Sequence, residues 1–282
     1  MIDGKEPGEL YLVATPIGNL EDITLRALRI LKEVPLIAAE DTRHTVKLLN
    51  RFDIRTELTP YHEHNKKEAE ERLIAHLLEG NDLALVSDAG LPCISDPGAE
   101  LAGAAIEKNI KVTPIPGANA ALSALIASGL SAREFTFVGF LPKTRKKCVE
   151  RLESLKGRAE TLIFYAAPHD IVQTLSILTE TFGEDRRAAI ARELTKTFEE
   201  FKRETLGELL KFYEENEAKG EFVIVVAGGE AKLEREETFD LKELYEEELK
   251  KGLSKKEAMR EVAKKLNISR REVYNELLKL PL

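Results

Sequence analysis

Two short segments of the 282-residue chain each combine carboxylates with cations directly after an apolar run. The first segment contains Glu40, Asp41 and Arg43, and the second contains Arg192, Glu193 and Lys196. Carboxylates beside cations suit the removal of a proton next to a bound phosphate group. Glu40, Asp41 and Glu193 are therefore the candidates for a general base, and the sequence does not rank them. The structural alternative is that these groups form ion pairs that tie two domains together.

A third segment, residues 82–98, has the composition of a ligand-binding loop after a buried strand. Residues 83–86 are consecutive apolar residues, and two glycines and two prolines follow before the segment ends. We expect the next helix to begin at Pro97, capped by Ser95 or Asp96. Ligands bind at the carboxyl ends of strands in open α/β sheets, so the loop is predicted to form a pocket for a small polar molecule. An ordinary strand-to-helix turn is the alternative.

Strand and helix patterns alternate through the first half of the chain. The predicted strands cover 10–15, 36–39, 58–61, 83–86 and 111–115, and predicted helices cover 45–52, 66–78, 99–108 and 120–128. A further helix follows the turn at 16–19, with Asp22 or Thr24 as its cap. This alternation predicts a parallel sheet with helices on its faces. The helix over 120–128 is rich in small residues, which either let a ligand approach closely or simply pack against the sheet.

The second half has strands that lie closer together in the sequence. Predicted strands cover 135–140, 161–166, 188–191 and 222–227, with helices over 171–182 and 205–216. This spacing is too short for parallel crossovers throughout, which predicts a mixed sheet. A basic segment follows the first of these strands and contains Lys143, Arg145, Lys146 and Lys147. It is either a loop that contacts phosphate groups or the solvated start of a helix.

The last part of the chain is predicted to be entirely helical, with helices over 241–251, 254–266 and 269–280. The last two begin with capping boxes, Ser254 with Glu257 and Ser269 with Glu272. Two short helices over a tight turn fit a helix-turn-helix, and a simple three-helix packing module is the alternative. The sequence thus predicts three domains, over residues 1–130, 131–238 and 239–282.

The net charge of −8 argues against a general nucleic-acid coat, but the charge is unevenly distributed. Residues 251–282 have a net charge of +5, and residues 1–250 have a net charge of −13. A basic end on an acidic body can indicate contact with a polyanion. A solvated pair of helices explains the charge equally well.

Several motifs that define other protein classes are absent from the sequence. Neither a GxGxxG fingerprint nor a GxxxxGK[ST] phosphate loop occurs, which argues against nicotinamide enzymes and nucleoside triphosphatases. His62 and His64 lack the accompanying ligands of a metal site, so no metal is expected. No apolar run has the length of a membrane span, the first residues lack a signal-peptide pattern, and only two cysteines occur. These features predict a cytoplasmic protein with no membrane contact.

Long motifs occur in a fixed order along nearly the whole chain. They are LVATPIGNLEDIT, AAEDTRHT, VSDAGLPCISDPG, PGANAALSALIASGL, FVGFLPK, LIFYAAPH, ARELTKTFEE and GEFVIVV. In this order they resemble the bacterial 16S ribosomal RNA cytidine 2′-O-methyltransferases of the tetrapyrrole methylase superfamily. The resemblance implies two α/β domains, S-adenosylmethionine in the cleft between them, a small all-α C-terminal domain and a homodimer. It also implies methyl transfer to a cytidine ribose 2′-hydroxyl of 16S ribosomal RNA in the 30S subunit.

Strand-end positions and the resemblance together assign residues to the expected site. The cofactor is expected to contact Pro16, Ile17, Gly18, Asp88, Ala89, Gly90, Ile94, Ser95, Ala120, Ala121, Tyr165 and Ala166. The three base candidates are expected to face the RNA. The cations expected to contact RNA are Arg43, Lys143, Arg145, Lys146, Lys147, Arg192, Lys196, Arg270 and Arg271.

The sequence departs from the family pattern at two places. The central loop reads Gly90-Leu91-Pro92 where the family has Gly-Thr-Pro, and residues 166–170 read Ala-Ala-Pro-His-Asp where the family has Glu-Ser-x-His-Arg. The contacts of the missing hydroxyl, carboxylate and guanidinium groups therefore do not carry over to this chain. Two other functions stay open: a methyltransferase of a small tetrapyrrole-like molecule, and a DNA-binding regulator that senses a ligand. RNA-independent turnover would favour the first, and specific binding of duplex DNA the second.

Overall fold

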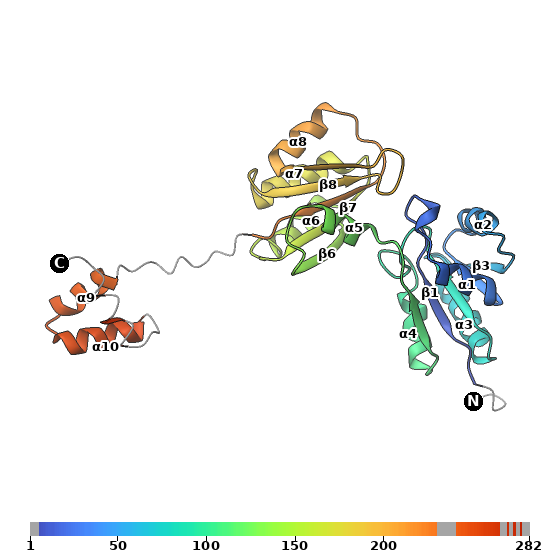
Figure 1. The fold of residues 1–282 in the computed structure, drawn as a ribbon, viewed down its shortest axis with the longest axis horizontal. Coiled ribbons are helices and arrows are strands. Elements are labelled where there is room, and N and C mark those ends of the chain that lie inside the picture. Colours follow the sequence, from blue (N-terminus) through green and yellow to red (C-terminus); the bar gives the residue numbers. More distant parts are fainter. Residues whose placement is uncertain (1–5, 230–240, 266–269, 271–272, 275–276, 278–282) are drawn as a thin grey trace. The chain divides into compact units, whose positions relative to one another are not determined.

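The computed structural model describes residues 6–229, 241–265, 270, 273–274 and 277 (Figure 1). The chain divides into two compact units, residues 1–229 and residues 230–282, which are described separately below. Within the described residues, no helix combines the length and the apolar character needed to cross a lipid bilayer. The predicted domain boundaries at residues 130 and 238 stay predictions.

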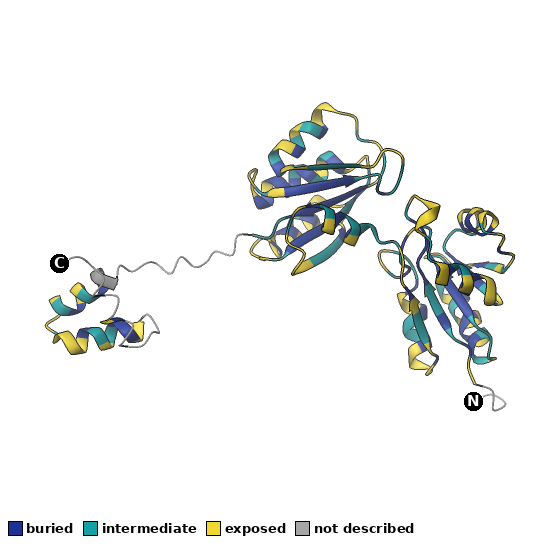
Figure 2. Cartoon of the chain, in the orientation of Figure 1, coloured by how far each residue is buried: buried dark blue, intermediate teal, exposed yellow. Residues whose placement is uncertain are grey.

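A parallel sheet forms the first half of the first unit. Its strands are β1 (Leu10–Val13), β2 (Leu36–Ala39), β3 (Glu57–Pro60), β4 (Leu83–Val86) and β5 (Val112–Ile115), in the spatial order β3-β2-β4-β1-β5. All neighbours pair in parallel, which confirms the predicted sheet. β4 lies at the centre of this order and all its residues are buried, as expected for a continuous apolar run. Figure 2 shows buried residues along the strands of both sheets.

Helices cover both faces of this sheet. They are α1 (Leu25–Glu33), α2 (Thr42–Arg51), α3 (Lys66–Leu78) and α4 (Ala99–Glu107), preceded by the 3-10 helix η1 (Leu20–Asp22). Leu83 and Leu85 of β4 face the core that α3 and α4 complete, while Ala84 and Val86 face the core of α1 and α2. Thr24, the second of the two predicted caps, accepts a hydrogen bond from the Ala27 backbone N–H at 3.0 Å and starts α1.

The second half of the first unit contains a mixed sheet, as predicted. Its strands are β6 (Phe135–Phe140), β7 (Thr161–Ala166), β8 (Arg187–Arg192), β9 (Glu200–Thr205) and β10 (Phe222–Val226), in the order β6-β7-β10-β8-β9. β6 and β7 pair in parallel, and the other neighbours are antiparallel. β9 was not expected because charged residues dominate its sequence. Charged side chains are typical of an edge strand, because they prevent further pairing.

The helices of this half also lie on both faces of their sheet (Figure 1). α6 (Arg145–Glu153), α7 (Ile171–Phe182) and α8 (Leu206–Glu215) pack on one face, and α5 (Ala120–Ala127) packs on the other. Arg145, Lys146 and Lys147 of the basic segment form the first turn of α6, as the helix-start interpretation expects, while contact of the segment with phosphate groups stays a prediction. The side chains of all three residues are exposed to solvent.

The second unit contains α9 (Leu241–Lys250) and α10 (Lys255–Lys265). The predicted capping box of α10 is present: Ser254 Oγ accepts from the Glu257 backbone N–H at 3.4 Å, and Glu257 Oε2 accepts from the Ser254 N–H at 3.0 Å. Leu244, Val262 and Val273 belong to its small apolar core. The second predicted capping box, Ser269 with Glu272, lies outside the described residues.

The loop after β4 differs from its prediction. α4 begins at Ala99, not at Pro97, and no side chain caps it. The helix starts two residues later because the loop before it is not helical: Cys93, Ser95 and Gly98 all have positive φ, at 70°, 67° and 138°. A Cβ atom on Gly98 would lie 2.7 Å from Leu85 Cδ2 and 2.9 Å from Cys93 Sγ. The glycine thus provides both a backbone conformation and a close contact that other residues cannot.

Replacing this glycine tests the packing of the loop. Gly98→Ala is expected to lower the free energy of unfolding by about 1–3 kcal/mol, because φ is 138° and the new methyl group has no room. Gly103→Ala is the matched control, because Gly103 lies inside α4 and a Cβ there meets nothing within 4 Å. The control is expected to gain up to about 1 kcal/mol. Urea denaturation of both variants measures the free energy of unfolding. Equal stability of the wild type and Gly98→Ala would contradict the packing described.

Candidate active site

A cavity of about 530 Å³ lies in the first unit, within the range of sites for small molecules. It is bounded by loops that follow strands of both sheets. Its lining residues are Ile17, Glu40, Asp88, Ala89, Gly90, Leu91, Ile94, Ser95, Asp96, Asn119, Ala120, Phe140, Tyr165, Ala166, Ala167, Pro168, Leu194, Glu221 and Val223. One wall is therefore acidic, and another is apolar and aromatic.

Backbone hydrogen bonds join the loops after β1 and β4. The N–H of Thr15 donates to the carbonyl of Gly90 at 2.8 Å, and the N–H of Gly90 donates to the carbonyl of Thr15 at 3.1 Å. The Thr15 hydroxyl also donates to the carbonyl of Ser87 at 3.1 Å. Gly90 has a φ of 82°, and a Cβ atom there would lie 3.3 Å from Ile17 Cγ2. These bonds fix the position of Ile17 and Gly90 at the cavity.

Three carboxylates line the cavity from the loops after β2 and β4: Glu40, Asp88 and Asp96. The Asp41 backbone N–H donates to Asp88 Oδ1 at 3.2 Å, and the Asp88 N–H donates to Glu40 Oε2 at 3.4 Å. The backbone of one loop thus holds the carboxylate of the other. The parallel pairing of β2 with β4 causes this, because it brings residues 40 and 88 to the same edge.

The pKa values of two of these carboxyl groups are raised. Burial, together with the charges of Glu40 and Asp88, raises the pKa of Asp96 from its ordinary 3.8 to about 6. Burial also raises the pKa of Glu40, and the charges of Asp88 and Asp41 act in the same direction. Burial and nearby like charges both disfavour the ionised form of a carboxyl group. Asp96 can therefore hold a proton up to about pH 6, and the proton affinity of Glu40 is raised by the same causes.

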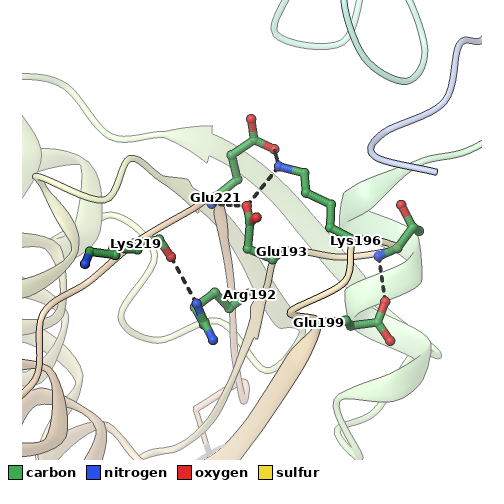
Figure 3. A network of polar contacts seen from close by, with 7 residues as sticks. Arg192, Glu193, Lys196, Glu199, Lys219 and Glu221 are labelled. Carbon is green, nitrogen blue, oxygen red and sulfur yellow. Dashed lines mark hydrogen bonds and ion pairs between the residues drawn. The ribbon is translucent and has the colours of Figure 1, made fainter. Parts of the chain in front are cut away.

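The other two predicted base candidates are held in ion pairs. Asp41 caps α2 and binds the Arg43 guanidinium at 2.7 Å, and these hydrogen bonds hold the pKa of its carboxyl well below the usual range. Glu193 binds Lys196 Nζ at 2.8 Å and accepts from the Glu221 backbone N–H at 3.0 Å (Figure 3). The hydrogen bond from Lys196 lowers the pKa of Glu193. Neither carboxylate lines the cavity.

The predicted RNA-contact cations have different environments. Lys143, Lys146 and Lys147 are exposed and form no ion pair with any carboxylate in the described part of the chain. Arg145, Arg43, Arg192 and Lys196 are paired, with Glu180, Asp41, Glu200 and Glu193 respectively. Arg270 is exposed, and Arg271 lies outside the described residues.

The two segments that combine carboxylates with cations, residues 40–43 and 192–196, do not connect the two sheets by ion pairs in the described structure. Where the structure describes them, the ion pairs of Arg192, Glu193 and Lys196 stay within residues 192–221, and Asp41 pairs with its neighbour Arg43. The two halves instead meet through close packing. A Cβ atom on Gly18 would lie 2.5 Å from Lys196 Cγ and 3.0 Å from the Leu194 carbonyl oxygen.

Nine of the twelve predicted cofactor residues line the cavity: Ile17, Asp88, Ala89, Gly90, Ile94, Ser95, Ala120, Tyr165 and Ala166. Pro16, Gly18 and Ala121 do not, since Pro16 and Ala121 are buried and Gly18 packs on the segment at 194–196. Sequence reasoning missed Asp96, Asn119 and Phe140 among others. The sequence indicated Asp96 only as a possible helix cap, and nothing in the sequence of β6 indicated where Phe140 points.

No group of three or more histidine, cysteine, aspartate or glutamate side chains among the described residues could hold a metal ion. His62 and His64 lie near each other, with ring centroids 6.0 Å apart. The His62 Nδ1 atom is buried and has no hydrogen-bond partner within the described structure.

Comparison with known proteins shows the family to which the chain belongs. The model of the tetrapyrrole (corrin/porphyrin) methylases matches residues 9–210. The chain is 51% identical over 274 residues to ribosomal RNA small subunit methyltransferase I of Halalkalibacterium halodurans, covering 96% of this chain and 94% of that protein. It is 49% identical to the protein of the same name from Bacillus subtilis, covering 97% and 95%. The chain therefore belongs to the tetrapyrrole methylase family and, within it, to the family of ribosomal RNA small subunit methyltransferase I.

Solved structures support the fold at lower identity. Uroporphyrin-III-C-methyltransferase from Thermus thermophilus has a TM-score of 0.56 and 24% identity, covering 80% of this chain and 97% of that one. A diphthine synthase has a TM-score of 0.60 and 18% identity, covering 78% and 90%. The predicted fold class and family are thus confirmed.

The raised pKa of Asp96 predicts a pH-dependent cost to stability. The folded state holds this proton more tightly than the unfolded chain, so the stabilisation present below about pH 4 is lost as the pH rises through about 6. Relative to the wild type, Asp96→Asn is expected to gain about 1–3 kcal/mol between pH 4 and pH 7.

Urea unfolding at a series of pH values measures this difference. Asp185→Asn, at an exposed position away from the cavity, is the matched control. A stability difference between Asp96→Asn and the wild type that stays constant from pH 4 to pH 8 would show that Asp96 is not buried beside like charges.

Proposed function

We propose that this protein transfers a methyl group from S-adenosylmethionine to a cytidine ribose 2′-hydroxyl of 16S ribosomal RNA in the small ribosomal subunit. The observation that carries the proposal is the 51% identity to ribosomal RNA small subunit methyltransferase I over nearly the whole chain. The cavity supports it, because its lining includes the strand-end loops to which the resemblance assigns the cofactor.

The cavity has the chemistry that S-adenosylmethionine needs. Ile17, Ile94 and Val223 give it apolar surface that suits an adenine ring and methylene groups. Carboxylates on the opposite loops accept hydrogen bonds from hydroxyl and ammonium groups and favour a positive charge. Asp88 is the best placed to hold the cofactor, because its orientation is fixed by the Asp41 backbone N–H.

When bound, S-adenosylmethionine supplies a methyl group bonded to a positively charged sulfur, and the sulfur is the leaving group when a nucleophilic oxygen attacks the methyl carbon. The walls of the cavity contribute by holding both reactants in one place, and such positioning can be worth roughly 7–11 kcal/mol. A general base removes the hydroxyl proton and contributes about 10²–10⁴-fold. The chain therefore needs a group at the cavity that can accept this proton.

We assign the proton acceptor to the pair Glu40 and Asp96. Both line the cavity, and both have a raised pKa. Catalysis by a base is most efficient when its pKa lies near the working pH. Asp41 is a weaker candidate, because Arg43 stabilises its ionised form and lowers its proton affinity.

The remaining assignments follow from charge and exposure. Lys143, Lys146 and Lys147 are proposed to contact RNA phosphates, because they are exposed and without carboxylate partners in the described structure. The basic end of the chain, residues 251–282 with a net charge of +5, is proposed to do the same. A homodimer fits the exposed apolar residues Leu122 and Ile126 on α5, which are 45% and 78% exposed. We place the protein in the cytoplasm, where ribosomal subunits are its substrate.

Methyl transfer to purified small subunits is the direct test. The protein is incubated with labelled S-adenosylmethionine and 30S subunits that lack ribose methylation, and nuclease mapping locates the label. A single labelled cytidine 2′-oxygen is expected.

Label on a base carbon or nitrogen, or on another nucleotide, would contradict the proposed chemistry. Absence of label with the cofactor still bound would mean that the substrate is wrong. Turnover with a small tetrapyrrole and no RNA would then identify the alternative function.

Variants of the carboxylates test the assignment of the base. Glu40→Gln and Asp96→Asn are each expected to lower kcat by about 10²–10⁴-fold, because an amide cannot accept the proton. Asp41→Asn and Glu193→Gln are expected to keep kcat within about tenfold of the wild type. For the wild type, kcat/KM is expected to rise as the pH increases through about 6, since the acceptor must be ionised.

Calorimetry on each variant separates loss of cofactor binding from loss of turnover. Normal kcat in both Glu40→Gln and Asp96→Asn would remove the assignment. A loss confined to Glu193→Gln would move the base to the segment after β8.

A further inference from the structure

β6 contains an irregularity that changes the direction of its last side chain. Phe137 pairs with Ile163 of β7, but Gly139 pairs with the next residue, Phe164, so Val138 is an extra residue. Gly139 has a φ of 72°, which a glycine adopts without strain. Such bulges often occur beside active sites, where they re-aim a side chain.

The bulge places two phenylalanines on the same face of the sheet. In a regular strand, Phe137 and Phe140 would point to opposite faces, because they are three residues apart. Here both rings contact Tyr165 edge to face, with centroids 5.1 Å and 5.4 Å away. Val138, the extra residue, packs into the core on the other face.

The bulge also lies against the loop after β4. A Cβ atom on Gly139 would be 3.4 Å from Ser95 Oγ. Phe140 therefore reaches the cavity, which it lines together with Tyr165 and Ser95. Its side chain is nevertheless 61% exposed. An aromatic ring that lines the cavity and is still largely exposed must lie where the cavity opens to solvent.

Cations follow Phe140 closely in the chain. Lys143 lies three residues further on, and Lys146 and Lys147 are in the first turn of α6. All three are exposed, and no ion pair joins them to a carboxylate that the structure describes. An exposed aromatic ring followed by unpaired cations is the arrangement by which proteins hold single-stranded nucleic acid, through base stacking and phosphate contact.

We propose that Phe140 is the stacking platform for a nucleobase of the RNA substrate, next to the ribose that receives the methyl group. This inference rests on the proposed function and names a substrate contact of the same site. Sequence-specific RNA recognition commonly unstacks a base and places it on an aromatic side chain. The edge contact with Tyr165 leaves Phe140 fixed in orientation, so little side-chain entropy is lost on stacking.

The adenine of S-adenosylmethionine is the other nucleobase that could stack here. The cavity offers the cofactor better-shielded apolar surface at Val223 and Leu194, which are buried. A macromolecular substrate can reach only exposed surface, and Phe140 is the exposed aromatic residue among those that line the cavity. Burial thus favours the RNA base at Phe140.

Three substitutions test the proposal. Phe140→Ala removes the ring, Phe140→Leu keeps apolar volume without a π face, and Phe140→Trp keeps stacking. Alanine and leucine are expected to lower kcat/KM for 30S subunits by about 5- to 100-fold, and tryptophan by less than about threefold. The dissociation constant of S-adenosylmethionine, measured by calorimetry, is expected to stay within about threefold of the wild type. Phe135→Ala is the matched control, because Phe135 is 42% exposed on the same strand but does not line the cavity.

Two outcomes would overturn the proposal. A leucine variant as active as the wild type would mean that only apolar contact matters. An alanine variant that loses cofactor affinity, while KM for the subunits at saturating cofactor is unchanged, would place adenine on Phe140.

A binding assay keeps this result separate from the proposed function. Binding of a short single-stranded cytidine oligonucleotide carrying 2-aminopurine is followed by fluorescence quenching, with S-adenosylhomocysteine present. Weaker binding by Phe140→Ala but not by Phe135→Ala supports stacking, even if the wild type methylates no subunit. Equal binding by Phe140→Ala and the wild type, together with normal methylation by both, would overturn the stacking role alone.

Discussion

The parallel pairing of β4 with both β1 and β2 is the constraint on which the site depends. Leu83 of β4 is opposite Leu10 of β1 and Leu36 of β2, so the three strands end at one edge of the sheet. The loops that follow must therefore meet there, whatever their own sequences are. Because β4 is buried on both faces, its position is fixed by the cores on either side. The loops that line the cavity are therefore held in place by the buried strands at the centre of the sheet.

Concentrating carboxylates at this edge costs stability and prepares the site for chemistry. Glu40, Asp88 and Asp96 repel one another, and burial strengthens the repulsion. The backbone offsets part of this cost, because the N–H groups of Asp41 and Asp88 donate to neighbouring carboxylates. A bound cation would offset more of it. The site is therefore less stable without its positively charged ligand, which is a common property of functional sites.

The sequence predicted the elements whose side-chain pattern is decided locally. The strand at 83–86, the helix at 66–78 and the capping box at Ser254 were all expected from short stretches of residues. β9 was missed because its charged residues are tolerated only at an edge, and edge position is a property of the whole sheet. The start of α4 was misplaced for a similar reason. Its position depends on the contact of Gly98 with Leu85.

The same distinction applies to the site residues. The cavity residues in loops after strands could be predicted, because the ends of strands can be recognised in the sequence. Most of the predicted cofactor residues do line the cavity. The base candidates could not be ranked, because their proton affinities depend on which partner each carboxylate meets in space. Arg43 is only two residues from Asp41 in the sequence, but the segment around Glu221 reaches Glu193 only through pairing of β8 with β10. Phe140 was missed because its direction depends on a one-residue register shift against β7.

The departure at residues 166–170 bears on where charge lies in the cavity. Ala166 is buried and Ala167 lines the cavity, at positions where the family pattern has glutamate and serine. The β7 wall of the cavity is thus apolar, formed by Tyr165, Ala166 and Ala167. Asp170, which replaces an arginine of the family pattern, is exposed and lies 3.3 Å from His169 Nε2. The negative charge that faces a cofactor from the loops after β2 and β4 therefore comes from Glu40, Asp88 and Asp96, and Glu221 adds a fourth carboxylate just before β10. It follows that, in this protein, these four carboxylates stabilise a positive charge in the cavity without the contribution that a glutamate at position 166 would add.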